Sequence, residues 1–229
     1  MTLQEFQDEL HANYQGDTEA PTSGDDTWNA RLALLKTAIR EWASEKGILW
    51  AELWTTLTAA ATGDKTVNAS DLDYSCPTDF DFVGGFVRTG SSGNWTYWQV
   101  VKPEKAELYL NESMRACYFT GNASTGFTIH FLQQPTAGDT IDYPYYKRPT
   151  MPSLTTDVIE MSDPMFAIYH VLSKKHEVDG AGSRAIKALR QAGAKMDGMR
   201  TRNIMPAFLQ DNVVPDQKND GEGASGFGA

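Results

Sequence analysis

The 229-residue chain lacks an apolar run long enough to span a membrane, and its first residues lack the basic start and apolar centre of a secretory signal. We therefore expect a protein of cytosolic origin that does not enter membranes. Cysteine is scarce too, because Cys76 and Cys117 are the only two and lie far apart. In a chain without a secretory signal, two such thiols are expected to be reduced and buried, although a disulfide between them stays open.

Basic residues are absent from the first 30 positions, which hold seven acidic ones. The whole chain has 20 basic and 30 acidic residues, which give a formal net charge of −10. So acidic a protein is poorly suited to gripping nucleic acid by neutralising phosphates. Between Lys174 and Arg202 the balance reverses and basic residues dominate.

This charge polarity has two interpretations. In the first, both regions are solvated helix faces. In the second, the acidic end of one subunit meets the basic helix of the next in a head-to-tail assembly. The candidate contacts for that assembly are Glu5, Asp8 and Glu9 on the acidic side and Arg184, Lys187 and Arg190 on the basic side.

Motifs of catalysis and cofactor binding are missing. No second histidine follows His176 at the zincin spacing, and neither a G-x-S-x-G elbow nor a Walker loop occurs. Residues 221–226 spell G-x-G-x-x-G, but the flanking strand and helix that the motif needs are absent. Calcium requires six or more oxygens in a characteristic loop, which the acidic stretch around Asp71, Asp73, Asp79 and Asp81 does not supply. We predict no catalytic residue, no cofactor and no metal.

Two helices are predicted near the N-terminus. Thr2 and Glu5 fit a capping box that starts a short amphipathic helix reaching Tyr14. A second helix carries a broad apolar seam from Trp28 to Trp42 and ends at Gly47.

Two further helices are predicted near the C-terminus. Asp163-Pro164 is a strong start signal for the first of them. The second runs from about Ser183 to Met199, with Ile186, Leu189 and Met196 predicted to face inward and its alanines permitting close approach of a neighbouring backbone.

Between these helical regions lie short alternating segments separated by turn residues, which predict an antiparallel sandwich or small barrel. Residues 48–61 read as a short turn running into a strand. The fold class is therefore α+β: residues 1–61 and 150–210 form a helical base, residues 62–149 a β-rich insertion, and residues 211–229 an extended tail. The tail has little to bury and is expected to be flexible unless a partner orders it, with Asn212, Val213 and Val214 as candidate contacts.

The segment Gly138–Pro149 closes the β-region. Ile141, Tyr143 and Tyr145 should point to one side of an extended chain, and Pro144 limits that chain to an edge strand or a strand end. We interpret the segment as the return strand that joins the β-region to the helical base. Tyr145 and Tyr146 are either core residues or partner contacts.

The order of these features resembles the head–tail connector (adaptor) proteins of tailed bacteriophages over nearly the whole length. The residues that carry the resemblance are the Trp28–Trp42 helix, Trp50-Ala51-Glu52-Leu53-Trp54, Pro77-Thr78-Asp79-Phe80, Gly138-Asp139-Thr140-Ile141, Tyr145-Tyr146-Lys147-Arg148-Pro149 and the Asp163-Pro164 helix.

The resemblance implies a non-enzymatic virion protein of the neck, assembled in the host cytoplasm as a homo-oligomeric ring, a dodecamer by that likeness. Its implied partners are a portal protein and a downstream tail or stopper protein, with DNA passing through the channel unbound. The large β-region and the glycine-rich tail depart from a minimal adaptor, so a stopper or tail-completion role stays open. The alternative class is a sugar-binding β-sandwich on a helical base, using exposed rings of the Trp95/Trp98 and Tyr143/Tyr146 sets.

Overall fold

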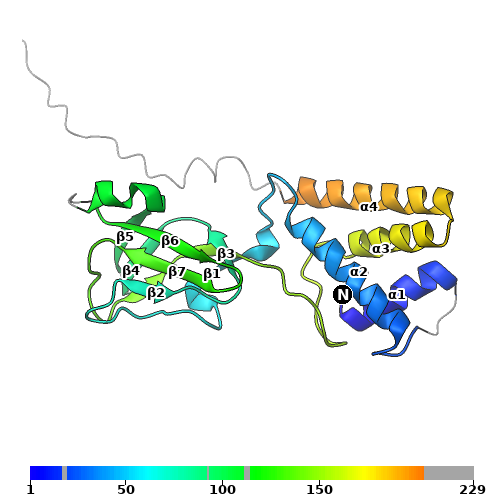
Figure 1. The fold of residues 1–229 in the computed structure, drawn as a ribbon, viewed down its shortest axis with the longest axis horizontal. Helices are drawn as coiled ribbons and strands as arrows, with labels where there is room; N and C mark the ends of the chain where they lie inside the picture. Colours follow the sequence, from blue (N-terminus) through cyan, green and yellow to red (C-terminus); the bar gives the residue numbers. More distant parts are fainter. Residues whose placement is uncertain (17–19, 92, 111–113, 204–229) are drawn as a thin grey trace, which may run out of the picture.

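The computed structural model describes residues 1–16, 20–91, 93–110 and 114–203, and it has the predicted α+β class. Helices gather at one end of the molecule and strands at the other (Figure 1). The tail expected at 211–229 lies outside the described residues. No helix within the described part of the chain is both long and apolar enough to cross a lipid bilayer.

The helical end consists of α1 (Leu3–Gln15), α2 (Asp26–Ala43), α3 (Met165–Val178) and α4 (Gly182–Arg202). The capping box is confirmed: the Thr2 hydroxyl accepts from the Glu5 amide at 3.2 Å, and the Glu5 carboxylate accepts from the Thr2 amide at 2.8 Å. α3 packs against α4 on one side and against α1 and α2 on the other. It is therefore the central layer of this end.

The α4 interface differs from the prediction. Ala185, Ala188 and Ala192 face the core, whereas Ile186 and Leu189 are 56% and 54% exposed. Only Met196 of the three residues predicted to face inward is buried. The reason is steric, because an alanine face lets α4 approach α3 more closely than a leucine face would.

The β end contains two sheets. The three-stranded sheet has the order β1-β9-β3, and the six-stranded sheet the order β2-β7-β6-β5-β4-β8. Short 3₁₀ turns, η1 (Ala51–Leu53), η2 (Leu57–Ala59) and η3 (Pro103–Tyr109), flank them. The strands are β1 (Trp54–Thr56), β2 (Asp73–Ser75), β3 (Phe80–Val83), β4 (Val87–Ser91), β5 (Asn94–Val100), β6 (Ala116–Asn122), β7 (Gly126–Phe131), β8 (Thr140–Asp142) and β9 (Pro144–Lys147).

The strand pairing is antiparallel with one exception. β5 and β6 run parallel, with Gln99 opposite Ala116 and Val100 opposite Cys117. A parallel pair needs a crossover connection, and η3 lies within the residues that link β5 to β6. The sequence pattern alone predicted only antiparallel pairing.

The segment Gly138–Pro149 contributes one strand to each sheet. β8 ends the order of the six-stranded sheet, as predicted for an edge strand, whereas β9 is the central strand of the other sheet. Pro144 is the first residue of β9, a position where a missing N–H is tolerated. Ile141, Tyr143 and Tyr145 are fully buried in the same cluster, as expected for residues on one side of an extended chain, but Asp142 and Tyr146 are buried too.

The buried apolar side chains form two clusters. One fills the helical end, and the other lies between the sheets. Tyr145 belongs to the β cluster, and its neighbour Tyr146 belongs to the helical cluster. The chain thus crosses from one cluster to the other between these two adjacent residues.

Candidate interaction surfaces

The outer face of α4 is basic and unpaired. Because the alanines of α4 pack against α3, Arg184, Lys187 and Arg190 are exposed to solvent. None of the three makes an ion pair with a described residue. The other basic residues near this helix differ, since Lys195 and Arg202 both lie near Asp163, at 3.3 Å and 3.5 Å.

The outer face of α1 is acidic, again without a cationic partner among the described residues. Leu3, Phe6 and Leu10 are buried, which turns Glu5, Asp8 and Glu9 to solvent. Within the described part of the chain, the three carboxylates make local hydrogen bonds: Glu5 accepts from the Thr2 amide, Asp8 from Gln4 and Glu9 from Asn13.

The two charged faces lie on opposite sides of α3. α4 covers one side of α3, and α1 with α2 covers the other (Figure 1). One subunit therefore cannot pair its own two faces, but two copies related by a rotation can.

An apolar groove lies beside the basic face. It has a volume of about 420 Å³ and runs between α3 and α4, with Ile186 and Leu189 on one wall and Lys174 and Glu177 on the other. Exposed branched side chains next to a charged rim are typical of a protein contact.

The two tyrosines proposed as partner contacts are not on the free surface. Tyr145 is fully buried and its hydroxyl donates to Asp79 Oδ1 at 2.9 Å, while Tyr146 stacks on Phe82 with ring centroids 4.9 Å apart. Burial raises the pKa of both phenols, and Asp79 raises that of Tyr145 further. Tyr145 packs in the β cluster and Tyr146 in the helical cluster.

The rings proposed for sugar stacking do not form an open platform. Trp98 and Tyr143 are buried in the β cluster. Trp95 is covered by the Arg88 guanidinium, 4.3 Å from the ring centroid. The rings of Trp98 and Tyr143 are therefore closed to a sugar, and Arg88 occupies one face of Trp95.

The carboxylates of the acidic stretch point to different partners. Asp71 accepts from Asn68, Asp73 contacts His130 at 2.7 Å, and Asp79 accepts from Tyr145. The described residues contain no group of three histidine, cysteine or acidic side chains arranged to hold a metal ion.

Both cysteines are free and buried, as expected. Burial raises the pKa of the Cys76 thiol to about 11 and moves that of Cys117 in the same direction. Neither thiol is an activated nucleophile.

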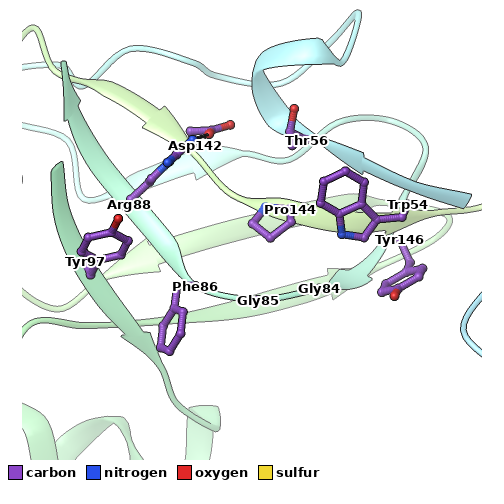
Figure 2. A pocket seen from close by; sticks show the side chains of 10 residues that line it. All are labelled: Trp54, Thr56, Gly84, Gly85, Phe86, Arg88, Tyr97, Asp142, Pro144 and Tyr146. Atoms are coloured by element: carbon purple, nitrogen blue, oxygen red, sulfur yellow. Dashed lines mark hydrogen bonds and ion pairs between the residues drawn. The ribbon is translucent and has the colours of Figure 1, made fainter. Parts of the chain in front are cut away.

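A pocket of about 450 Å³ opens where the two sheets meet (Figure 2). Its walls carry aromatic and proline side chains, chiefly Trp54, Phe86, Tyr97, Pro144 and Tyr146, and the backbone of Gly84–Gly85 runs along it. Trp54 is 44% exposed and Tyr97 is 59% exposed. The sequence pattern did not single out this pocket, because its walls come from segments distant in the chain.

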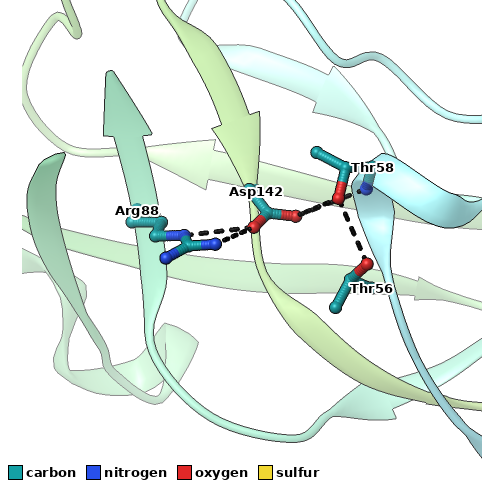
Figure 3. A network of polar contacts seen from close by, with 4 residues as sticks. All are labelled: Thr56, Thr58, Arg88 and Asp142. Carbon is teal, nitrogen blue, oxygen red and sulfur yellow. Dashed lines mark hydrogen bonds and ion pairs between the residues drawn. The ribbon is translucent and has the colours of Figure 1, made fainter. Parts of the chain in front are cut away.

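A partly buried ion pair fixes one wall of the pocket (Figure 3). Arg88 Nη2 and Nε donate to Asp142 Oδ2 at 2.6 Å and 3.1 Å, and the Asp142 carboxylate raises the pKa of Arg88. The other carboxylate oxygen accepts from the Thr58 hydroxyl at 3.0 Å and from its amide at 3.3 Å. The network ties β4, β8 and η2 together and leaves Asp142 with no unsatisfied oxygen.

Asn212, Val213 and Val214, the predicted tail contacts, lie outside the described residues. Among the other predicted contacts, the structure presents the acidic and basic sets on separate outer faces and buries the two tyrosines. It offers partners two outward helical faces of opposite charge, an apolar groove and an aromatic pocket. Each of these surfaces is available for contact with another protein.

Comparison with known proteins identifies the family of the chain. The family model described as SU10 adaptor protein matches residues 1–208, and the chain belongs to this family, which is a family of phage head–tail adaptors. Membership makes the chain a structural component of a bacteriophage virion. A search of curated proteins finds no match to the chain.

Proposed function

We propose that this protein forms a ring beneath the portal of a tailed phage and joins the capsid to the tail. The observation that supports the proposal is the pair of unpaired, oppositely charged faces on either side of α3. Because the two faces are different surfaces, contact between them is heterologous, and heterologous contacts close into rings when the rotation permits.

In this arrangement the acidic face of α1 lies against the basic face of α4 in the next subunit. Exposed ion pairs contribute only about 0.2–1 kcal/mol each, so these charges set the register and orientation of the subunits. The apolar groove beside Ile186 and Leu189 supplies the surface whose burial stabilises the contact.

The net charge of −10 fits a conduit for DNA. An acidic lining repels the phosphate backbone, so that the duplex passes without being held. The ring surrounds the channel, the portal lies on one side, and a stopper or tail protein lies on the other.

The first test is electron microscopy of the purified protein mixed with the portal protein of the same phage. We expect co-axial rings of this chain on the portal. If this chain persistently fails to bind the portal or to form rings there, the proposal is wrong. A monomer in isolation would not, because the portal can template the ring.

The second test concerns the charged faces. Reversing Arg184, Lys187 and Arg190 to Glu should weaken ring formation at low salt, with the difference shrinking as salt screens the contact. Changing Asp8 and Glu9 to Lys in the same chain should restore rings, while Glu5 keeps its capping role. Sedimentation velocity with portal at several salt concentrations measures both effects.

The matched control reverses three exposed lysines elsewhere, Lys46, Lys102 and Lys105, which changes the net charge by the same amount. Rings that assemble equally well from the wild-type chain and the α4 variant would refute the charge-polarity argument. If the control weakens assembly as much as the α4 variant, net charge and not the α4 face is responsible.

A further inference from the structure

We infer that the pocket between the sheets is the docking site for residues 204–209 of the same chain, which follow directly after α4. This inference does not depend on ring assembly. It rests on where α4 ends, on the character of the pocket and on the composition of the residues that come next.

The end of α4 is clamped close to the pocket. Asn203 donates from Nδ2 to the Leu49 carbonyl at 2.8 Å and accepts at Oδ1 from the Ala51 amide at 2.8 Å. Ala51 begins η1, and Trp54, which lines the pocket, directly follows this turn. A 3₁₀ turn rises about 2 Å per residue, so the clamp and the pocket wall are about 6 Å apart along η1.

The chain beyond the clamp is suited to reach the pocket and fill it. It reads Ile204-Met205-Pro206-Ala207-Phe208-Leu209, has no charged residue and is the most apolar stretch after α4. Proline at position 206 disfavours a helix through this stretch of sequence. Five extended residues span about 17 Å, which brings Phe208 within reach of Trp54 and Pro144.

The pocket matches such an occupant. Its walls are aromatic rings and a proline, and Trp54 and Tyr97 keep a large part of their surface uncovered. Both oxygens of Asp142, its acidic member, accept hydrogen bonds from Arg88 and Thr58, so the pocket presents no uncompensated charge to an apolar segment (Figure 3). Arg88 donates two of its five N–H groups to Asp142, so further N–H groups can donate to backbone carbonyls of the occupant.

Docking in this position would add a further link between the helical end and the β end. It would lie beside the Tyr145–Tyr146 joint, because the pocket includes Tyr146. The family match ends at residue 208, so most of the docked segment lies within the matched region and the glycine-rich residues after it do not.

The test uses the full chain carrying the photoreactive analogue p-benzoylphenylalanine in place of Phe208. The matched control carries it in place of Phe227, in the same tail. Protein labelled with ¹⁵N is mixed with unlabelled protein before irradiation, and cross-linked peptides are identified by mass spectrometry. We expect cross-links from position 208 to peptides containing Trp54, Pro144 or Tyr146, within one isotopic form only. Trp54→Ser should remove these cross-links while the circular dichroism spectrum stays unchanged.

Hydrogen exchange gives a second measurement. Phe208→Ser should cause a loss of protection at residues 54–56 and 84–88, and Phe227→Ser should not. Cross-links between labelled and unlabelled chains would place the segment in a neighbouring subunit and overturn the inference. Cross-links to the α3–α4 groove, or equal labelling from positions 208 and 227, would also overturn it.

Discussion

At the scale of single residues, Asp142 shows how a charge is kept inside this protein. Its side chain is almost fully buried, yet both oxygens accept hydrogen bonds, from Arg88 on one side and from Thr58 on the other. A buried carboxylate is tolerated only when it is paired and fully hydrogen-bonded. The partners lie 54 and 84 positions away in sequence, so no local pattern could reveal them.

Replacing Asp142 with Ala should lower the free energy of unfolding by about 2–3 kcal/mol, because Arg88 and Thr58 lose their acceptor. The effect stays below that of a fully buried pair because the Arg88 side chain is 38% exposed. Urea unfolding followed by tryptophan fluorescence measures it. Asp197→Ala is the control, since it removes an exposed pair with Arg200 and should cost less than about 1 kcal/mol. Equal losses in the two variants would contradict a structural role for the buried network.

His170 is a second residue whose environment decides its behaviour. It is 5% exposed on α3, its ring lies against Phe166, and its Nε2 is 3.5 Å from the Glu41 carboxylate of α2. Burial lowers the pKa of His170, and Lys174 lowers it further, while Glu41 opposes the shift. The net direction is downward, so the folded protein favours the neutral imidazole.

The stability of the protein should therefore depend on pH through His170. Below about pH 6.5 the unfolded chain binds a proton that the folded chain does not, so the free energy of unfolding falls until the folded-state pKa is reached. His170→Gln should flatten that fall. Urea titrations at pH 7.5, 6.5 and 5.5 measure the slopes. If the His170 variant keeps the wild-type slope, the fall has another origin.

At the scale of the element, small residues determine which face of α4 packs against α3. Its alanines pack on α3, and its branched residues Ile186 and Leu189 border a groove instead of filling the core. An apolar period of about 3.6 residues indicates a helix but does not say which of two apolar stripes packs inward. The close approach of α3 decides in favour of the smaller side chains.

Two Gly→Ala substitutions should have opposite effects in a helix and in a strand. In α4, Gly193→Ala should stabilise the protein by about 0.5–1 kcal/mol, because a Cβ there meets no atom within 4 Å and the unfolded chain loses freedom. In β4, Gly90 has φ +147°, and a Cβ would lie 2.1 Å from the Asn94 carbonyl oxygen. Gly90→Ala should therefore destabilise by more than about 1 kcal/mol. Thermal and urea unfolding measure both, and effects of the same sign would show that this view of the backbone is wrong.

At the scale of the whole molecule, the buried side chains form two separate clusters that meet at Tyr145–Tyr146. We propose that residues 1–61 with 150–210 form one structural unit and residues 62–149 the other. The clusters support that division, except that Leu57 packs with the β-region and Tyr146 packs with the helical cluster. A few ties cross the joint, among them the ion pair between Lys147 and Glu160.

Two units with separate cores should open separately. Leu35→Ala, in the helical cluster, should cost about 2–5 kcal/mol and speed amide exchange in α2 and α3 while leaving β5 to β7 protected. Ile129→Ala, in the β cluster, should do the reverse. Native-state hydrogen exchange at low denaturant measures both variants. If either substitution speeds exchange throughout the chain, the molecule opens as a single cooperative unit.

The sequence by itself determined the local features of this protein. The Thr2 capping box, the seam from Trp28 to Trp42, the placement of Ile141, Tyr143 and Tyr145 on one side of the chain, and the separation of acidic from basic segments all follow from neighbours in the chain. The tertiary structure alone decided the parallel pairing of β5 with β6, the central place of β9, the inward face of α4 and the pocket around Arg88 and Asp142. The physical reason is that periodicity and capping are set within one or two turns, whereas pairing, packing distance and the partner of a buried charge depend on segments that meet only after the chain has folded.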